Sequence, residues 1–272
     1  MGNSNICIIG PRASGKTTYL AALAYKKRLS SKSKNFNLHP LNDDSRAIAD
    51  KAENIICQGE SVEPTVIGDV IQSVDDLPFY SFNIEIKKNF FSKTESFHLN
   101  VRDYPGEVFE KIAEPNLSDS IQEFIKECLM KDVVGCLILL TGWEKGTDKF
   151  YNRVMNRFID LMDANDRLGD LKLAVAMSKC ERGELWPGRI EPEIDLFGVH
   201  LPNTKATLKE RVPPKNLRFY ALSTFGVLRR TDPRPNRIDE QGKYGKASVL
   251  REASHWHPYN MIDPLYWLSK KG

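Results

Sequence analysis

The chain has 272 residues, of which 41% are hydrophobic, enough to build the core of one large domain. Its 39 basic and 36 acidic residues leave a formal charge of +3, so the composition gives no reason to expect attraction to nucleic acid or to a membrane surface. No apolar stretch approaches the ~20 residues that a membrane-spanning helix needs. No two of the five cysteines form a C-x-x-C pair, which excludes a zinc knuckle and favours free, buried thiols in the cytoplasm.

The N-terminal part of the chain begins with one strand and two helices. Residues 6–9 form a short apolar run that predicts a buried strand, and the pattern that follows predicts a helix from about Gly15 to Leu29. Residues 30–42 are polar and are predicted to be a loop. Apolar residues between Ile48 and Ile56 then share one helical face, and Gly59 fits just past the end of this second helix.

Strands dominate the next part of the chain. Two runs of alternating apolar and polar residues, Phe82–Ile86 and Phe97–Val101, predict an antiparallel hairpin with a long loop. An amphipathic helix is predicted over 117–128. The continuous apolar run Val133–Leu140 is typical of a strand that is covered on both faces of a sheet.

The C-terminal half continues to alternate. A helix is predicted over 150–162, and buried strands are predicted over 171–177 and 217–222. Between these two strands only one weak helical pattern occurs, near 204–211. Residues 229–260 are predicted to be mostly irregular, and a last helix then begins at Asp263-Pro264.

This order of elements predicts an α/β fold with a doubly wound, mostly parallel sheet and one antiparallel strand. We expect a single domain over 1–272, with a core at about 5–228 and a C-terminal helix at 263–271. Insertions are expected at about 30–58 and 183–215, because these segments exceed what the core needs. Ligands of such sheets bind at the carboxyl ends of the strands.

One motif carries a phosphate-binding mechanism. Gly10-Pro11-Arg12-Ala13-Ser14-Gly15-Lys16-Thr17 matches G-x-x-x-x-G-K-[ST] between the first strand and the first helix. Its glycines let backbone N–H groups point at phosphate oxygens, and the helix N-terminus adds its positive pole. Lys16 supplies a charge for the β- and γ-phosphates, and the Thr17 hydroxyl is a ligand for Mg²⁺. We therefore expect nucleotide to contact Gly10, Arg12, Ala13, Ser14, Gly15, Lys16, Thr17 and Thr18.

Two polar segments at strand ends could complete this site. Asp103 follows the second hairpin strand and could hold the Mg²⁺ shell, while Gly106 could offer a backbone N–H to the γ-phosphate; alternatively D-x-P-G is a plain turn. After the strand at 171–177, Lys179 could cover a purine ring and Glu181 could accept two hydrogen bonds from guanine, with Ser223 supporting the base. The alternative is a polar loop at a strand end.

Together these elements resemble the Ras-like small GTPases of the translation-factor-related class, over residues 6 to about 228 plus the last helix. Gly10–Thr17 is similar to their phosphate loop, Asp103–Gly106 to their D-x-x-G element, and Ser178–Glu181 to their N/T-K-x-D element, with Ser and Glu as departures. Ala221–Ser223 loosely resembles their S-A-K/L element. The phosphate loop and Glu107, which follows D-x-P-G, also resemble the bacterial double-GTPase group that is associated with conflict systems.

The resemblance implies a P-loop domain that binds GTP or GDP with Mg²⁺. Pro64–Gly68 is similar to the first switch of Arf- and Rho-like members, so Thr65 would join Thr17 and Asp103 at the Mg²⁺ ion. A protein effector or activating protein would bind the switch segments, near 59–78 and 103–118.

Two departures bear on hydrolysis. Glu107 stands where these GTPases usually have the glutamine that orients the attacking water, and its carboxylate either repels phosphate oxygens or acts as a base. Arg12 stands where they usually have glycine; it either reaches the γ-phosphate as an arginine finger or is a solvated surface residue. We expect slow GTP hydrolysis, with Lys16, Thr65 and Gly106 as the other residues at the reacting phosphate.

Two other classes of function remain open. The first is a P-loop kinase or ATPase acting on a small acceptor, in which the arginines between Arg229 and Arg237 would mimic a lid. Otherwise these arginines are expected to lie in a solvated loop, or to bind an acidic partner or phosphates. The second is a nucleotide-loaded structural module with little hydrolysis, which Glu107 favours over an efficient hydrolase. Selectivity for GTP over ATP and the rate of turnover separate these classes.

Overall fold

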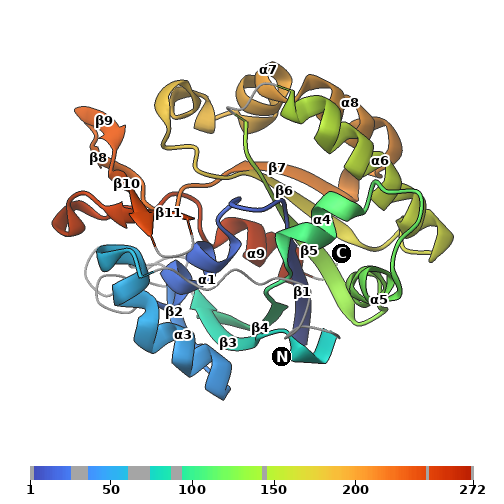
Figure 1. Cartoon of the computed structure of the whole chain (residues 1–272), viewed down its shortest axis with the longest axis horizontal. Coiled ribbons are helices and arrows are strands. Elements are labelled where there is room, and N and C mark those ends of the chain that lie inside the picture. Colours follow the sequence, from blue (N-terminus) through green and yellow to red (C-terminus); the bar gives the residue numbers. More distant parts are fainter. Residues whose placement is uncertain are drawn as a thin grey trace.

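A computed structural model of the protein describes residues 3–25, 36–60, 74–86, 94–142, 146–242 and 245–270. Its centre is a seven-stranded sheet with the strand order β2-β3-β4-β1-β5-β6-β7 (Figure 1). These strands are β1 (Asn3–Ile9), β2 (Phe36–Pro40), β3 (Phe79–Ile86), β4 (Glu95–Arg102), β5 (Val133–Leu140), β6 (Lys172–Met177) and β7 (Leu217–Ala221). β3 runs antiparallel to both of its neighbours, and the other pairs are parallel. The predicted α/β sheet with one antiparallel strand is therefore confirmed.

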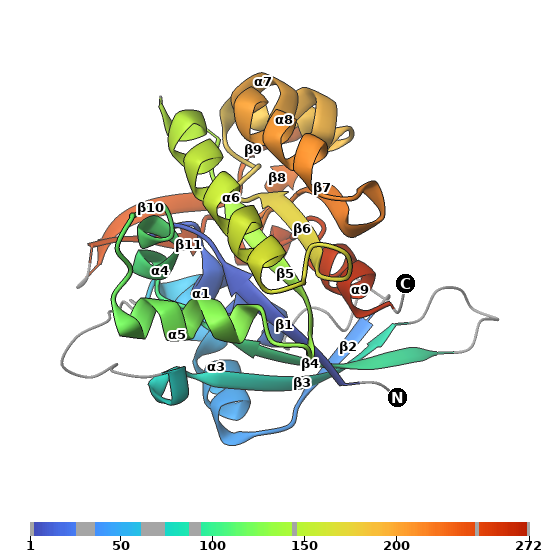
Figure 2. The same cartoon turned by 90° about the vertical axis from the view of Figure 1, so that its right-hand side faces the viewer.

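Side chains that alternate along β1 contribute to two separate cores. Ile6 and Ile8 belong to the core on one face of the sheet, and Cys7 and Ile9 belong to the core on the other. Helices α1, α3 and α9 cover the first face, and α5, α6 and α8 cover the second (Figure 2). Their bounds are α1 (Lys16–Ala24), α3 (Asp43–Glu53), α5 (Asp119–Cys128), α6 (Thr147–Ala164), α8 (Pro202–Arg211) and α9 (Asp263–Ser269). Burial on both faces explains why β5 is a continuous apolar run.

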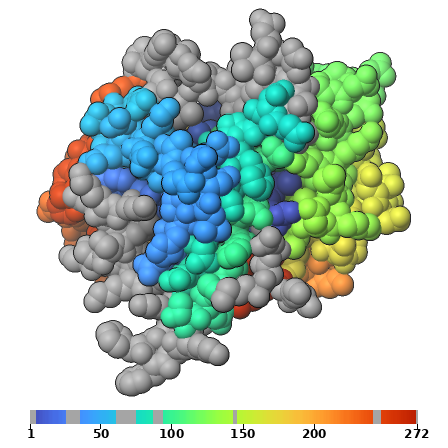
Figure 3. All heavy atoms as spheres, turned by 90° about the horizontal axis from the view of Figure 1, so that it is seen from below, coloured from blue at the N-terminus to red at the C-terminus, as the bar shows by residue number. Residues whose placement is uncertain are grey.

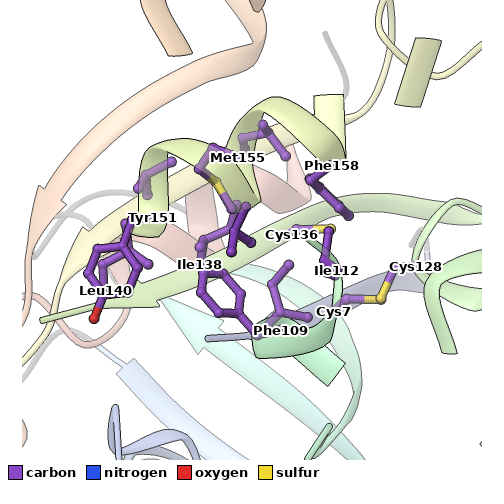
Figure 4. Packing of buried hydrophobic residues seen from close by; sticks show 14 of the residues in the cluster. Cys7, Phe109, Ile112, Cys128, Cys136, Ile138, Leu140, Tyr151, Met155 and Phe158 are labelled. Carbon is purple, nitrogen blue, oxygen red and sulfur yellow. The ribbon is translucent and has the colours of Figure 1, made fainter. Parts of the chain in front are cut away.

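The cysteines contribute to these cores as small apolar side chains. Cys7, Cys128 and Cys136 pack near Phe158 and other side chains of the second core (Figure 4). All five cysteines are free and four of them are buried, as the sequence predicts. Among the described helices, none combines the length and the apolar character needed to cross a bilayer.

Polar contacts tie α3 to the sheet. The Asn42 side chain accepts a hydrogen bond from the Ser45 backbone N–H at 3.0 Å, and Ser45 Oγ donates to the Ser81 carbonyl oxygen at 2.8 Å. Figure 3 shows α3 in blue against the teal residues of β3. The helix continues into the π-helix η1 (Asn54–Gln58) and ends at Gly59, whose φ of 67° is left-handed. The predicted C-terminal glycine is therefore confirmed.

Residues 30–42 were predicted to be a loop, and for residues 36–40 this prediction was wrong, whereas the weak helix predicted near 204–211 is present as α8. Residues 36–40 form the edge strand β2, whose backbone pairs with β3 although only Leu38 is buried. Within 183–215, the π-helix η5 (Pro192–Phe197) buries its last two residues. Edge strands and short irregular helices have no long apolar pattern, because little of their surface faces a core.

Two hairpins also occupy the region that was predicted to be irregular. β8 (Val227–Arg229) pairs with β9 (Asp232–Pro235), and β10 (Arg237–Gly242) pairs with β11 (Gly245–Leu250). The sequence of β10 is almost entirely polar, so it gave no strand signal; its backbone pairing with β11 and its polar contacts hold it in place.

Arg167 fastens the end of α5 to the start of β5. The side chain is buried and donates to the carbonyl oxygens of Leu129 at 2.8 Å, Met130, and Val133 at 2.7 Å. Its Nε also donates to Asp170 at 3.0 Å. One guanidinium thus donates to three backbone acceptors where α5 ends and β5 begins.

We predict that Arg167→Met lowers the free energy of unfolding by roughly 3 kcal/mol, because the buried carbonyl oxygens would lose the donors that the guanidinium supplies. Urea denaturation measures the change. Arg153→Met is the matched control, since Arg153 lies on the exposed side of α6 and stacks on Phe150. Equal losses in the two variants would contradict the role assigned to Arg167.

Candidate functional site

The predicted phosphate loop joins β1 to α1 in a tight turn. Gly10 lies against β5, where a Cβ atom would sit 2.3 Å from the Leu139 carbonyl oxygen, so only glycine fits. Ala13 and Gly15 have positive φ angles of 57° and 93°. The Ser14 N–H donates to the Pro11 carbonyl at 3.2 Å. The loop therefore curls around a point just beyond the carboxyl end of β1.

Lys16 is buried beneath this loop. Its Nζ donates to the carbonyl oxygens of Gly10 at 2.9 Å and Pro11 at 3.2 Å. Burial lowers the pKa of Lys16, while the negative charges of Asp103 and Glu110 act in the opposite direction. A buried ammonium that bonds to two carbonyl dipoles and lies near two carboxylates is suited to exchange its partners for phosphate oxygens.

Sheet pairing brings the second polar segment to the loop. Asp103 directly follows β4 and forms a parallel bridge with Ile8 of β1. Thr17 Oγ1 donates to Asp103 Oδ2 at 2.5 Å. Burial raises the pKa of Asp103, and the Lys16 charge and the Thr17 hydroxyl partly oppose this shift. Two of the predicted Mg²⁺ ligands thus lie in direct contact.

Two of the three buried side-chain atoms that lack a hydrogen-bond partner among the described residues lie at this place. Within the described residues, neither Asp103 Oδ1 nor Ser14 Oγ has a hydrogen-bond partner, although both are buried. Such atoms are rare in folded proteins and call for a ligand or an ion. A carboxylate oxygen beside a hydroxyl oxygen is the donor chemistry that Mg²⁺ prefers. Thr17 and Asp103 therefore fit a metal site, whereas Thr65 lies outside the described residues.

The helix α4 (Gly106–Lys111) packs directly on the loop and was not predicted from the sequence. A Cβ at Gly106 would lie 2.5 Å from the Arg12 backbone N, so the two backbones nearly touch. Arg12 N donates to Glu110 Oε1 at 2.9 Å, and the Arg12 guanidinium forms an ion pair with Glu107. Both departures from the small-GTPase pattern, Arg12 and Glu107, are therefore partners of each other.

The predicted base-reading residues lie beside the loop. Lys179 follows β6 with a φ of 57°, and its Cε lies 3.7 Å from the position of a Cβ on Gly15. Burial lowers the pKa of Lys179 to about 8, and the nearby charges of Arg237 and Arg182 add to this shift. Glu181 is only 1% exposed, and its Oε2 accepts a hydrogen bond from Ser223 Oγ at 2.7 Å.

Arg237 is a site residue that the sequence analysis missed. It was expected in a solvated loop, and this expectation was wrong, because the Arg237 side chain is 6% exposed and its Nη1 lies 3.3 Å from Glu181 Oε1. Arg234 and Arg229 do lie on the surface. Glu181 and Arg237 are separated by 56 residues, and no local pattern indicates that they meet.

Two further residues predicted to contact the nucleotide lie on the loop and at the start of its helix. Thr18 lies in the first turn of α1 and is partly buried, and Ala13 is exposed on the loop. The first predicted switch, including Pro64–Gly68, falls on residues that the structure does not describe.

A comparison of the sequence with known protein families identifies the family of the chain. The Double-GTPase 1 family matches residues 7–146, just over half of the chain. The chain belongs to the Double-GTPase 1 family. The matched part of this family member contains the phosphate loop, α1, Asp103 and β5, and so the predicted double-GTPase resemblance is confirmed.

Solved structures similar to this double-GTPase chain are GTPases of low sequence identity. The signal recognition particle receptor SRb from Chaetomium thermophilum, in a GTP complex with SRX, is 12% identical with a TM-score of 0.39; the match covers 83% of this chain and 93% of that one. The Saccharomyces cerevisiae Ski7 GTPase-like domain bound to GTP is 17% identical (TM-score 0.42), over 82% of this chain and 43% of that one. The elongation factor SelB from Methanococcus maripaludis with GppNHp is 11% identical (TM-score 0.35), over 82% and 30%. No curated protein matches the sequence.

We predict that Gly106→Ala lowers the nucleotide affinity by a hundredfold or more, because the new methyl group would push α4 away from Arg12 in the loop. Titration of a fluorescent guanine nucleotide measures the loss. Gly169→Ala is the matched control, since no atom lies within 4 Å of a Cβ at Gly169. Wild-type affinity in Gly106→Ala would show that α4 does not need this close approach.

Proposed function

We propose that this double-GTPase family member is a guanine-nucleotide-binding switch that binds GTP or GDP with Mg²⁺, hydrolyses GTP slowly and signals to a protein partner. The contact between Thr17 and Asp103, made beside the buried Lys16, carries this proposal. It joins the phosphate loop to the segment after β4, so one bound triphosphate would contact both.

The phosphate chemistry follows from the buried charges. Lys16 would exchange its bonds to the Gly10 and Pro11 carbonyls for the β- and γ-phosphates. Thr17, Asp103 and Thr65 would hold Mg²⁺, which supplies positive charge to the phosphate oxygens. The unpartnered oxygens of Asp103 and Ser14 support a ligand at this place.

The base would be read by Glu181. A carboxylate offers about four acceptor positions, and Ser223 and Arg237 use one on each oxygen. The remaining positions can accept hydrogen bonds from the N1–H and 2-amino groups of guanine. Adenine presents no matching pair of donors, so the carboxylate favours guanine. The stem of Lys179, close to Gly15, would cover the ring.

Slow hydrolysis fits the ion pair between Arg12 and Glu107. The Glu107 carboxylate cannot donate a hydrogen bond to a phosphate oxygen while it accepts one from water, as a glutamine can. The Arg12 guanidinium, whose side chain is 57% exposed, is directed to Glu107 rather than free for an arginine-finger role. Both groups would have to separate before either could act on the γ-phosphate.

The segment at 103–118 is suited to report the nucleotide state. It includes α4, whose Glu107 and Glu110 hold the Arg12 side chain and backbone. A γ-phosphate bonded to the Gly106 N–H would compete with these carboxylates for the same loop, and its loss after hydrolysis would release them. A protein partner that contacts α4 and the segment near 59–78 would distinguish the two states.

We predict that the protein binds GDP and GTP at least a hundredfold more tightly than ATP, a difference of ~2.7 kcal/mol. Titrations of fluorescent GDP, GTP and ATP with Mg²⁺ measure it. Lys16→Ala should lose all three, because the phosphate charge would have no buried partner. Equal or tighter ATP binding would remove the guanine assignment and favour the P-loop kinase or ATPase.

Glu181→Gln sharpens this test. The glutamine amide can donate to the C2 carbonyl of xanthine, whereas it matches guanine poorly, so preference should shift from GDP towards xanthosine diphosphate. An unchanged preference would mean that Glu181 does not read the base.

We predict slow cleavage of GTP in single-turnover assays, with little change in Glu107→Ala, since the Arg12–Glu107 pair occupies the position of the water-orienting glutamine. Fast cleavage that is lost only in Glu107→Ala would overturn this prediction. Adding cell extract separates a switch, whose turnover a partner accelerates, from a structural module, whose turnover stays low.

A further inference from the structure

The hairpin β10–β11 contributes a buried cation to the base-reading carboxylate. Arg237 is the first residue of β10 and lies beyond both the last strand of the sheet and the part of the chain that the family matches. Figure 1 shows this hairpin to one side of the sheet, away from α5 and α6. A segment outside the part that the family matches therefore contacts the predicted base-reading residue Glu181.

The Arg237 guanidinium is held in a fixed orientation. Its Nε donates to Asp239 Oδ1 at 2.6 Å, and its Nη2 donates to Ser248 Oγ at 2.6 Å. Ser248 Oγ donates in turn to Asp239 at 2.9 Å, and Asp239 forms an ion pair with Arg182. The guanidinium also lies over the ring of Phe225, with 5.6 Å between Arg237 Cζ and the ring centroid. These contacts come from both strands of the hairpin, so the hairpin geometry sets where Nη1 points.

Glu181 needs such a partner for two reasons. A carboxylate that is 1% exposed is costly to bury unless a cation or hydrogen bonds compensate for its lost hydration. Glutamate also has one more rotatable bond than the aspartate usual in the N/T-K-x-D element, so its carboxylate can adopt more orientations. Arg237 at Oε1 and Ser223 at Oε2 restrict both oxygens at once.

We propose that Arg237 is a positioning residue for base recognition, which holds the Glu181 carboxylate in one orientation and aims its free acceptor positions at guanine. This inference rests on the proposed function, because it presumes that Glu181 reads the base. It makes the β10–β11 hairpin part of the nucleotide site and accounts for a glutamate at position 181 where an aspartate is usual.

The test compares GDP, IDP and ADP as fluorescent derivatives in wild type, Arg237→Ala and Arg237→Lys. IDP lacks the 2-amino group, so the ratio of GDP to IDP affinity reports one bond to Glu181. We expect Arg237→Ala to lower GDP affinity at least tenfold and to bring the GDP/IDP ratio close to one, with ADP affinity unchanged. Arg237→Lys should give intermediate values, because a lysine keeps the charge but not the fork of donors.

Arg234→Ala is the matched control, since Arg234 lies on the neighbouring strand β9 and pairs with Asp232 on the surface. Ser248→Ala is a milder second variant that removes one support of Arg237 and should lower the GDP/IDP ratio in the same direction. A wild-type ratio in Arg237→Ala, or a parallel loss of all three nucleotides in Arg237→Lys and Ser248→Ala, would overturn the inference. Failure of the proposed function is distinct, because wild-type protein itself would then show no preference for GDP over ADP.

Discussion

The hydrogen bond from the Thr17 hydroxyl to the Asp103 carboxylate closes the candidate site across 86 residues of chain. It forms because β4 pairs with β1 in parallel, and because Asp103 continues this pairing opposite Ile8. The same register puts α4 over the phosphate loop, close enough for the backbones of Gly106 and Arg12 to touch. The site therefore depends on sheet register, since a shift of one residue would turn Asp103 to the other face.

Burying the charges of Lys16 and Asp103 is costly for the folded protein when no ligand is bound. Lys16 and Asp103 shift each other's pKa in the direction that offsets burial, yet the Asp103 Oδ1 and Ser14 Oγ atoms remain without partners. Among the described residues, the one other buried side-chain atom without a partner is Asn83 Oδ1 on β3, whereas the buried Arg167 bonds to several carbonyl acceptors. Buried polar atoms often lack a hydrogen-bond partner where a bound ligand would supply one. The unpartnered oxygens of Asp103 and Ser14 therefore indicate a ligand site at the end of β1.

The sequence alone predicted those segments whose residue pattern follows from a single local requirement, such as binding one ligand or being buried on both faces. The phosphate loop has fixed spacing because its glycines and lysine act on one ligand, and β5 is apolar because both faces of it are covered. The edge strand β2 and the polar strand β10 escaped prediction, since backbone pairing rather than apolar burial holds them. The pairing of Arg12 with Glu107, and of Arg237 with Glu181, depends on tertiary geometry that no spacing encodes.

The β10–β11 hairpin contacts both Glu181 and Gly59. Arg237 pairs with Glu181, and Val249, in the adjacent register pair of the hairpin, packs so closely on Gly59 that a Cβ there would lie 2.7 Å from Val249 Cγ1. Gly59 ends the helix that leads into the segment predicted to be the first switch. Continuous antiparallel register from Arg237–Leu250 to Gly242–Gly245 makes the hairpin one unit. The same hairpin therefore contacts both the predicted base-reading carboxylate and the glycine that precedes the predicted first switch, so one element outside the sheet supports two parts of the candidate site.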